Sequence, residues 1–262
     1  MSLPEVTGGG RPIVIGVGLK MYLDPAQTLA WSETVAAIAR KHEAVVFGRV
    51  SLFVLPTFPM LSAVIDVFAD TRVRVGAQDL FWEDRGAFTG EVSGADLRQL
   101  GCRLVEVGHA ERRGLFGEDD EIVALKLAAA IRNGLRPVLC VGEHERGGVD
   151  EAGASCIRQL ESALSRVDSD AAAPIIVAYE PEWAIGAEQS AGSGHVAAVV
   201  ATLRSWLDAQ PRLSGSRVIY GGSAGPGLLT EFGSAVDGLL LGRFAHDPAA
   251  LEAVLDEAVS TS

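Results

Sequence analysis

The stretch Ile175-Ile176-Val177-Ala178-Tyr179 is apolar throughout, and Glu180 and Pro181 follow it directly. A short run without polar alternation is typical of a strand that is buried on both faces of a parallel sheet. Similar runs recur along the chain. We expect strands at Ile13–Leu19, Ser51–Leu55, Val73–Ala77, Leu104–Val107, Pro137–Val141, Ile175–Tyr179, Arg217–Tyr220 and Gly238–Leu241.

Longer segments with helical periodicity separate these runs. Asp24 is a good N-cap before Pro25, and Asn133-Gly134 is a helix stop signal. The helices that we expect are Pro25–Arg40, Pro59–Ala69, Gly94–Leu100, Glu118–Asn133, Asp150–Val167, Ser193–Gln210, Gly225–Glu231 and Pro248–Val259.

Eight strands that each precede a helix predict an α/β fold, a (β/α)8 barrel, and 262 residues suit one such barrel. We expect a single domain over residues 12–262 and a flexible tail over residues 1–11. A doubly wound open sheet is the structural alternative that the same elements allow.

The composition limits the class of partner. The net charge of −12 argues against a nucleic-acid partner, which would need a basic face, but it leaves room for a small anion held by backbone N–H groups. Cys102, Cys140 and Cys156 are too few and too scattered for a disulfide framework or a metal motif. Reduced thiols in a cytoplasmic protein are the plain interpretation of these cysteines. No apolar run is long enough to cross a membrane.

Side chains that perform chemistry in such a barrel gather at the carboxyl ends of the strands. Three of these ends carry Lys20, His109 and Glu180. A carboxylate beside an apolar wall can act as a general base once water is excluded. A histidine at a helix N-terminus should have a lowered pKa and donate a hydrogen bond while neutral. A lysine there can balance the charge of an enediolate or a phosphate.

Each of these residues also has a plain interpretation: a solvated glutamate, a capping or core histidine, a surface lysine. Glu111 is either a second acid or base or the partner of Lys20. Arg112 and Arg113 are expected to make structural ion pairs. The remaining histidines have no comparable context, and we assign them to capping or core roles: His42, His144, His195 and His246.

Two further features fit a ligand site. The loop after Glu180 carries Trp183 and Ile185, which could close over a ligand or simply pack on the barrel rim. Gly-bearing turns follow the last two strands, at Gly221-Gly222-Ser223 and Gly242-Arg243. Barrels often bind phosphate with these two loops.

With these residues placed, the chain resembles the triosephosphate isomerase family from about Gly18 to the last strand. The motifs that carry the resemblance are Lys20-Met21, Gly76-Ala77-Gln78-Asp79, Gly86-Ala87-Phe88-Thr89-Gly90-Glu91, Gly108-His109-Ala110-Glu111-Arg112-Arg113, Phe116-Gly117-Glu118, Cys140-Val141-Gly142-Glu143, Tyr179-Glu180-Pro181-Glu182-Trp183-Ala184-Ile185-Gly186 and Tyr220-Gly221-Gly222-Ser223.

The resemblance implies a role for each site residue. Enzymes of that family pair a glutamate base with a neutral histidine, which makes Glu180 the base and His109 the electrophile. Lys20 would stabilise negative charge, and Glu111 would assist. Backbone groups at three positions would hold the phosphate, under a lid over Pro181–Ala191 that includes Trp183 and Ile185: Gly186, Ser223 and Gly242.

The resemblance also implies the setting of the reaction. It predicts an isomerase of the glycolytic and gluconeogenic type that needs no cofactor and no metal and works as a cytoplasmic homodimer. The loop Gly86–Glu91 would insert into the neighbouring subunit, where Thr89 would approach the other site. Cys140 resembles the family and is expected to pack rather than react.

Two departures fall on the substrate side of the site. Gly18 stands where the family has an asparagine, and the missing asparagine side chain leaves space. Arg243 replaces the second of two glycines, so it either points at the ligand or changes the loop path. Smaller departures are Ala110 and Glu188-Gln189.

Three functions stay open. The first is isomerisation of dihydroxyacetone phosphate and glyceraldehyde 3-phosphate, with neutral drift at Gly18 and Arg243. The second is a tetrulose-phosphate isomerase of polyol breakdown, which converts L-erythrulose 1-phosphate to D-erythrulose 4-phosphate. In that case Gly18 would give room and Arg243 a donor for the added CHOH group. The third is an inactive barrel that binds a sugar phosphate, since a fold alone does not prove activity.

Overall fold

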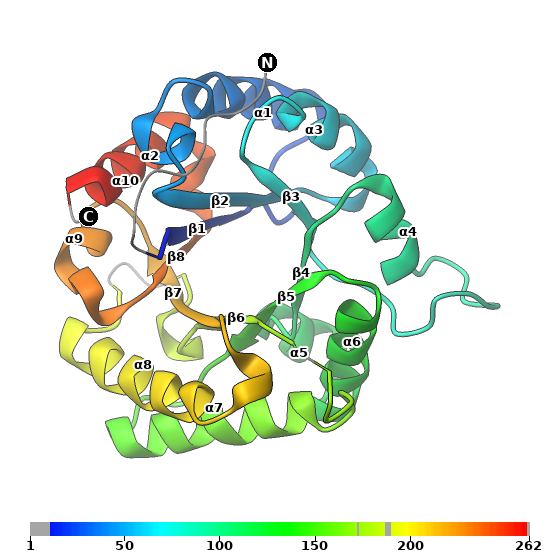
Figure 1. The fold of residues 1–262 in the computed structure, drawn as a ribbon, viewed down its shortest axis with the longest axis vertical. Helices are drawn as coiled ribbons and strands as arrows, with labels where there is room; N and C mark the ends of the chain where they lie inside the picture. The colour runs from blue at the N-terminus through cyan, green and yellow to red at the C-terminus, as the bar shows by residue number, and fades with distance from the viewer. Residues whose placement is uncertain (1–10, 172, 187–189, 261–262) are drawn as a thin grey trace.

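The computed structural model describes residues 11–171, 173–186 and 190–260. Within them, eight parallel strands form a closed barrel in which every strand pairs with its neighbours in sequence and β8 pairs with β1 (Figure 1). The strands are β1 Ile13–Gly18, β2 Val50–Leu55, β3 Arg74–Ala77, β4 Leu104–Val107, β5 Arg136–Val141, β6 Ile176–Tyr179, β7 Arg217–Ala224 and β8 Gly238–Leu241. The expected barrel is confirmed, and the alternative of a doubly wound open sheet is wrong.

Helices surround the barrel on its outside (Figure 1). They are α1 Pro25–Ala39, α2 Glu43–Val46, α3 Leu61–Phe68, α4 Gly94–Leu100, α5 Ala110–Phe116, α6 Asp120–Arg132, α7 Val149–Leu164, α8 Ser193–Asp208, α9 Leu228–Phe232 and α10 Pro248–Ser260. Single 3₁₀ turns η1 to η5 lie at Phe58–Met60, Glu182–Ala184, Pro211–Leu213, Gly233–Ala235 and Arg243–His246. No helix of the described residues is long and apolar enough to cross a membrane.

Capping residues explain why some helices begin where the sequence predicts and others begin a few residues later. Asp24 caps α1, because its side chain accepts the Gln27 N–H at 2.8 Å. The helix expected from Glu118 begins only at Asp120, because Asp119 is its cap. The helix expected from Gly225 begins at Leu228, after Gly227 takes a φ of 93°. The short helix α2 was not expected, although His42 caps it with its ring nitrogen.

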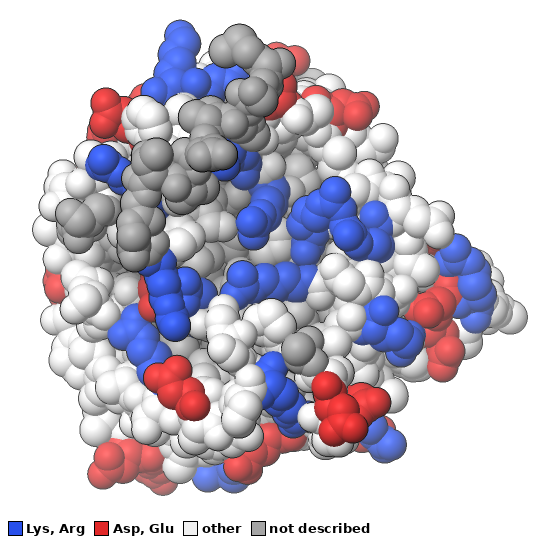
Figure 2. All heavy atoms as spheres, in the orientation of Figure 1, with Lys and Arg blue, Asp and Glu red and all other residues white. Residues whose placement is uncertain are grey.

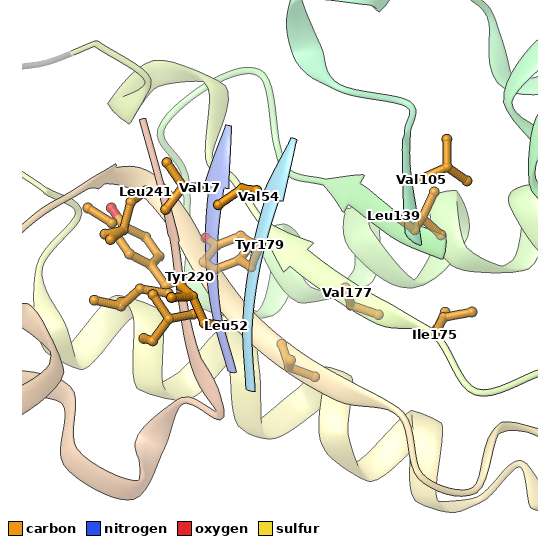
Figure 3. Packing of buried hydrophobic residues seen from close by; sticks show 14 of the residues in the cluster. Val17, Leu52, Val54, Val105, Leu139, Ile175, Val177, Tyr179, Tyr220 and Leu241 are labelled. Carbon is orange, nitrogen blue, oxygen red and sulfur yellow. The ribbon is translucent and has the colours of Figure 1, made fainter. Parts of the chain in front are cut away.

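The core has two parts. Inside the barrel, side chains from alternate strand positions fill the lumen, and Phe53 and Leu240 lie so close to Gly16 that any side chain there would collide with them. Outside, the other strand positions pack against the helices. Figure 3 shows residues of this outer layer, including Val17, Val54, Tyr179 and Tyr220. The lumen is therefore a packed core, and open space begins only above it.

Charge is unevenly distributed over this acidic protein. On the face drawn in Figure 2, Lys and Arg lie near the middle, and Asp and Glu lie mainly toward the edge. Arginines open β3, β5 and β7 at Arg74, Arg136 and Arg217. Burial lowers the pKa of Arg136, and the charges of Arg217 and Arg74 lower it further, so these guanidinium groups are close to one another.

β7 is longer than expected and irregular. It continues past Tyr220 to Ala224, and its register against β8 shifts between these two residues. Ser223 within the shift has a φ of 51°. A bulge of this kind turns backbone groups out of the ladder. It thereby presents Gly221, Gly222 and Ser223 to the carboxyl end of the barrel.

The ends of β5 and β6 approach each other closely. A Cβ built on Gly142 would lie 1.9 Å from the carbonyl oxygen of Glu180. Only glycine therefore permits the observed backbone position of Glu180.

We predict that Gly142→Ala lowers the free energy of unfolding by about 3 kcal/mol, because the added methyl group pushes the β6 backbone away. Urea denaturation measures the change. Gly148→Ala is the matched control, since a Cβ there meets nothing within 4 Å, and it should change stability by less than about 0.5 kcal/mol. Equal stabilities of the two variants would show that the close approach does not constrain the barrel.

Candidate active site

Most of the residues expected at the site line one cavity at the carboxyl end of the barrel, of about 590 Å³, whereas Pro181, Trp183 and Thr89 do not. Its walls include all four expected catalytic residues, and also Gly18, Ile185, Gly186, Ser223, Gly242 and Arg243. Groups that are far apart in the chain, such as Lys20 and Glu180, meet here because their strands end at the same mouth.

Glu180 follows β6 and is 4% exposed. Among the described residues, its Oε2 atom has no hydrogen-bond partner, and it lies 3.7 Å from His109 Nε2. Burial raises the pKa of this carboxyl group, although the charges of His109 and Lys20 oppose the rise. A Cβ on Gly221 would stand 2.6 Å from Glu180 Oε1, so the glycine of the β7 bulge makes room for the carboxylate.

His109 lies at the end of β4 and caps α5. Its Nδ1 atom accepts the backbone N–H of Glu111 at 3.1 Å, which leaves Nε2 as the nitrogen that carries hydrogen toward the cavity. Burial alone would lower the pKa of His109, but the carboxylates of Glu180 and Glu106 raise it, and the net direction is upward. The lowering expected from the helix N-terminus is therefore wrong.

Lys20 and Glu111 form an ion pair at 2.5 Å. Of the two alternatives for Glu111, this contact shows the partner of Lys20. Lys20 has a φ of 47°, an unusual backbone conformation for a residue with a side chain. The Gln78 amide holds that conformation by donating to the carbonyl oxygens of Lys20 and Leu55, at 3.0 and 2.9 Å. Gln78 therefore positions the lysine.

A buried ion cluster supports α5 from behind. Lys126 is 3% exposed, contacts both oxygens of Asp79 at 2.7 and 2.8 Å, and also pairs with Glu118. Arg112 joins the same two carboxylates. Arg113 pairs with Asp120. The expected structural role of the two arginines is confirmed, and it fixes the helix that carries His109 and Glu111.

Hydrogen bonds hold the loop after Glu180 to the barrel rim on both sides of residues 187–189, which lie outside the described residues. Ser223 Oγ donates to the carbonyl oxygen of Ala184 at 2.9 Å, and the N–H of Ala191 donates to the Tyr220 hydroxyl at 2.9 Å. Trp183 is half-buried, and its Nε1–H donates to Glu143 at 2.8 Å. Trp183 thus packs on the rim in this structure, and closure of the lid stays a prediction. Glu188-Gln189 lies outside the described residues.

Of the remaining histidines, His42 caps α2 as expected, whereas His144 is exposed, so the capping or core role expected for it is wrong. His195 and the Tyr179 hydroxyl share the Glu143 carboxylate that also holds Trp183. His144 contacts Glu182 at 2.8 Å. Tyr179 and His195 therefore anchor the base of the loop rather than reaching the cavity.

The expected phosphate end of the cavity combines backbone and charge. Gly186, Ser223 and Gly242 line it, and Gly186 has a φ of 73°. Arg243 begins η5, is exposed, and lies with Nη2 4.0 Å from the Cβ position of Gly186. Of the two alternatives for Arg243, this position favours a guanidinium that faces a ligand at the phosphate end.

The cavity wall also contains one residue that the sequence did not single out. Glu106 lies in β4, is 8% exposed and lines the cavity. Burial raises the pKa of its carboxyl group to about 7, against the opposing charge of His109. A lone carboxylate inside an apolar strand was the available signal. A Cβ on Gly18, which lines the same cavity, would meet nothing within 4 Å, so the expected space is present.

Comparison with known proteins agrees with this geometry. Residues 13–258 match the family model for triosephosphate isomerase. The chain belongs to the triosephosphate isomerase family. Membership confirms the fold class and the reaction class that the motifs predicted, an isomerase of small phosphorylated sugars.

Relatives within the family carry two different names. The chain is 52% identical, over 96% of its length and 98% of the relative, to L-erythrulose-1-phosphate isomerase of Pectobacterium atrosepticum. It is 40% identical, over 80% of its length and 86% of the relative, to triosephosphate isomerase of Moorella thermoacetica. The crystal structure of triosephosphate isomerase from Bartonella henselae covers 94% of this chain and 99% of its own, with a TM-score of 0.79 and 28% identity.

We predict that Glu106 makes stability depend on pH. Its carboxyl pKa is about 7 in the folded protein and about 4.5 when unfolded, so the folded state binds the proton more tightly. Stability should therefore fall as the pH rises from about 4.5 to about 7, and Glu106→Gln should remove that loss. The difference in unfolding free energy between Glu106→Gln and the wild type should grow, in favour of the variant, by about 2–3 kcal/mol between pH 5 and pH 8. A constant difference across this range would show that Glu106 is not a costly buried charge.

Proposed function

We propose that this protein interconverts L-erythrulose 1-phosphate and D-erythrulose 4-phosphate. The observation that carries the proposal is the open volume at Gly18, beside a complete set of base, electrophile and lysine. Similarity to a relative named L-erythrulose-1-phosphate isomerase, over almost the whole of both chains, supports the same substrate. The triose reaction, placed first in the sequence analysis, is the second candidate, and the relatives named triosephosphate isomerase support it less strongly.

The two substrates differ at one place. Dihydroxyacetone phosphate has a carbonyl group between its phosphorylated carbon and the carbon that loses a proton. L-Erythrulose 1-phosphate has the same arrangement, with a hydroxymethyl group in place of one hydrogen on the carbon that reacts. The same catalytic groups can therefore act on both, and only the room around the reacting carbon needs to differ.

The mechanism follows from the side chains at the cavity. Glu180 removes the proton from C3, while Nε2–H of His109 donates to the C2 carbonyl oxygen, and an enediolate forms across C2 and C3. Lys20 stabilises the negative charge. Glu180 returns the proton to C2, and the C3 hydroxyl proton passes through His109 to the C2 oxygen, which leaves the carbonyl group at C3. The product has the composition of the substrate and, renumbered, is the 4-phosphate.

The phosphate group would lie at the other end of the cavity. Backbone groups of Gly186, Ser223 and Gly242 can approach it closely, and Arg243 adds a positive charge beside Gly186. Dianion binding there would orient the reacting carbons toward Glu180 and His109. This placement requires no cofactor.

A homodimer and a cytoplasmic location stay predictions. The loop that includes Thr89 projects away from the barrel (Figure 1), and Thr89 and Phe88 are exposed. An exposed, projecting loop with an aromatic tip fits insertion into a second copy of the chain.

The substrate assignment is tested by the ratio of kcat/KM for L-erythrulose 1-phosphate to that for dihydroxyacetone phosphate. We expect a preference of about 100-fold or more for the tetrulose, since the vacant space would otherwise go unfilled. Equal or better turnover of the triose would contradict the proposal. Binding of both without turnover would instead support an inactive barrel.

We predict that Glu180→Gln lowers kcat about 1000-fold or more with little change in KM, because the amide keeps the shape of the side chain but cannot accept the proton. Steady-state kinetics with the preferred substrate measures both constants. Glu161→Gln, on the exposed surface of α7, is the control and should retain wild-type values. Wild-type kcat in Glu180→Gln would refute the role of the base.

A further inference from the structure

Glu106 is the inward-facing carboxylate of β4. Leu104, two positions earlier on the same strand, belongs to the side chains that fill the barrel lumen. Because side chains alternate along a strand, Glu106 also points inward, one layer higher. Its 8% exposure and its position in the cavity wall show that the carboxyl group faces the ligand space from below.

The structure does not otherwise satisfy this carboxyl group. Among the described residues, its hydrogen-bond contact is with the thiol of Cys140, at 4.0 Å from Sγ to Oε1, and it takes part in no ion pair. A thiol is a weak donor. A buried carboxyl group without strong partners is costly, so its lone pairs and any proton it carries are available to a group that enters the cavity.

The surrounding charges place Glu106 near the reacting groups. Its pKa responds to the charges of His109 and Glu180, and the pKa of His109 responds to Glu106 in return. Arg243, by contrast, lies beside Gly186 at the phosphate end. The two ends of the cavity therefore offer different partners to a ligand that spans them.

The chemistry of the proposed substrate determines which end of the cavity its hydroxymethyl group occupies. The hydroxymethyl group of the tetrulose is attached to the carbon that loses the proton, on the side away from the phosphate. It must therefore lie near Glu180 and His109, and far from Arg243. Gly18 leaves space on the wall of the same cavity.

We propose that Glu106 hydrogen-bonds the terminal hydroxyl group of the four-carbon substrate and thereby selects it over the triose. This inference rests on the proposed function. It assigns to Glu106 the polar contact that the sequence analysis had offered to Arg243, and it leaves Arg243 to the phosphate. The carboxyl group can accept from the hydroxyl when ionised and donate to it when protonated, so it serves the contact in either form.

The test is a comparison of Glu106→Leu and Glu106→Gln on both substrates. Leucine keeps the bulk and removes the polar atoms, so kcat/KM for L-erythrulose 1-phosphate should fall by about 100-fold or more. The value for dihydroxyacetone phosphate should change by less than about threefold, because that substrate has no terminal hydroxymethyl group. Glutamine can still accept and donate, and should lose only about tenfold on the tetrulose.

Two controls separate selection from structural support. Cys140→Ala removes the thiol contact of Glu106, and it should leave the ratio of the two kcat/KM values within about twofold of wild type. Gly18→Asn fills the space at Gly18, and it should lower tetrulose turnover more than triose turnover. Circular dichroism and thermal unfolding check that each variant is folded, and Glu106→Gln keeps the test valid if Glu106→Leu does not fold.

Each outcome bears on a different claim. Equal losses on both substrates in Glu106→Leu and in Glu106→Gln would overturn the inference and leave the proposed function intact. Failure of the wild-type enzyme to turn over L-erythrulose 1-phosphate would overturn the proposed function and the inference together. A selective loss on the tetrulose, with the triose unaffected, supports both.

Discussion

Closure of the hydrogen-bonded strand ring is the constraint on which the rest of the structure depends. β1 pairs with both β2 and β8, so no strand end can move without displacing its neighbours. The ring brings Lys20, His109 and Glu180 to one mouth although they lie far apart in the chain. Glycines permit the closest approaches, since a Cβ at Gly238 would lie 1.7 Å from the Val14 carbonyl oxygen. The catalytic geometry is a consequence of this ring.

The electrostatics of the cavity follow from burial of several charges in one place. Glu106, Glu111 and Glu180 share it with Lys20 and Arg243. Glu111 is neutralised by Lys20 at 2.5 Å, and burial raises the carboxyl pKa of the other two glutamates. Buried charged groups that cost stability are typical of functional sites. A phosphate at the Arg243 end and a hydroxyl at the Glu106 end would satisfy both parts of the cavity.

The sequence predicted those site residues whose placement depends only on lying at the end of a strand. Lys20 and Glu180 follow apolar runs directly and His109 follows the strand after Gly108, and in a parallel barrel that position is enough. Glu106 could not be found in this way, because whether a residue within a strand faces the lumen or a helix depends on register. The predicted direction of the His109 pKa shift was wrong for a related reason. The helix terminus is visible in the sequence, but the carboxylates of Glu180 and Glu106 reach the imidazole only through the fold. Helix α2, which is four residues long, carries too little periodicity to be recognised.

The central claim is that Glu180 and His109 face the same carbons of one phosphorylated ligand, with Glu106 at its far end. It is tested most directly by a crystal structure with a four-carbon phosphorylated hydroxamate, which mimics the enediolate. The account predicts Glu180 oxygens within about 3.5 Å of the reacting centre, His109 Nε2 on its oxygens, the phosphate at Gly186, Ser223 and Gly242, and the terminal hydroxyl on Glu106. A ligand bound outside this cavity, or bound in it with Glu180 and His109 on no common group, would contradict the account.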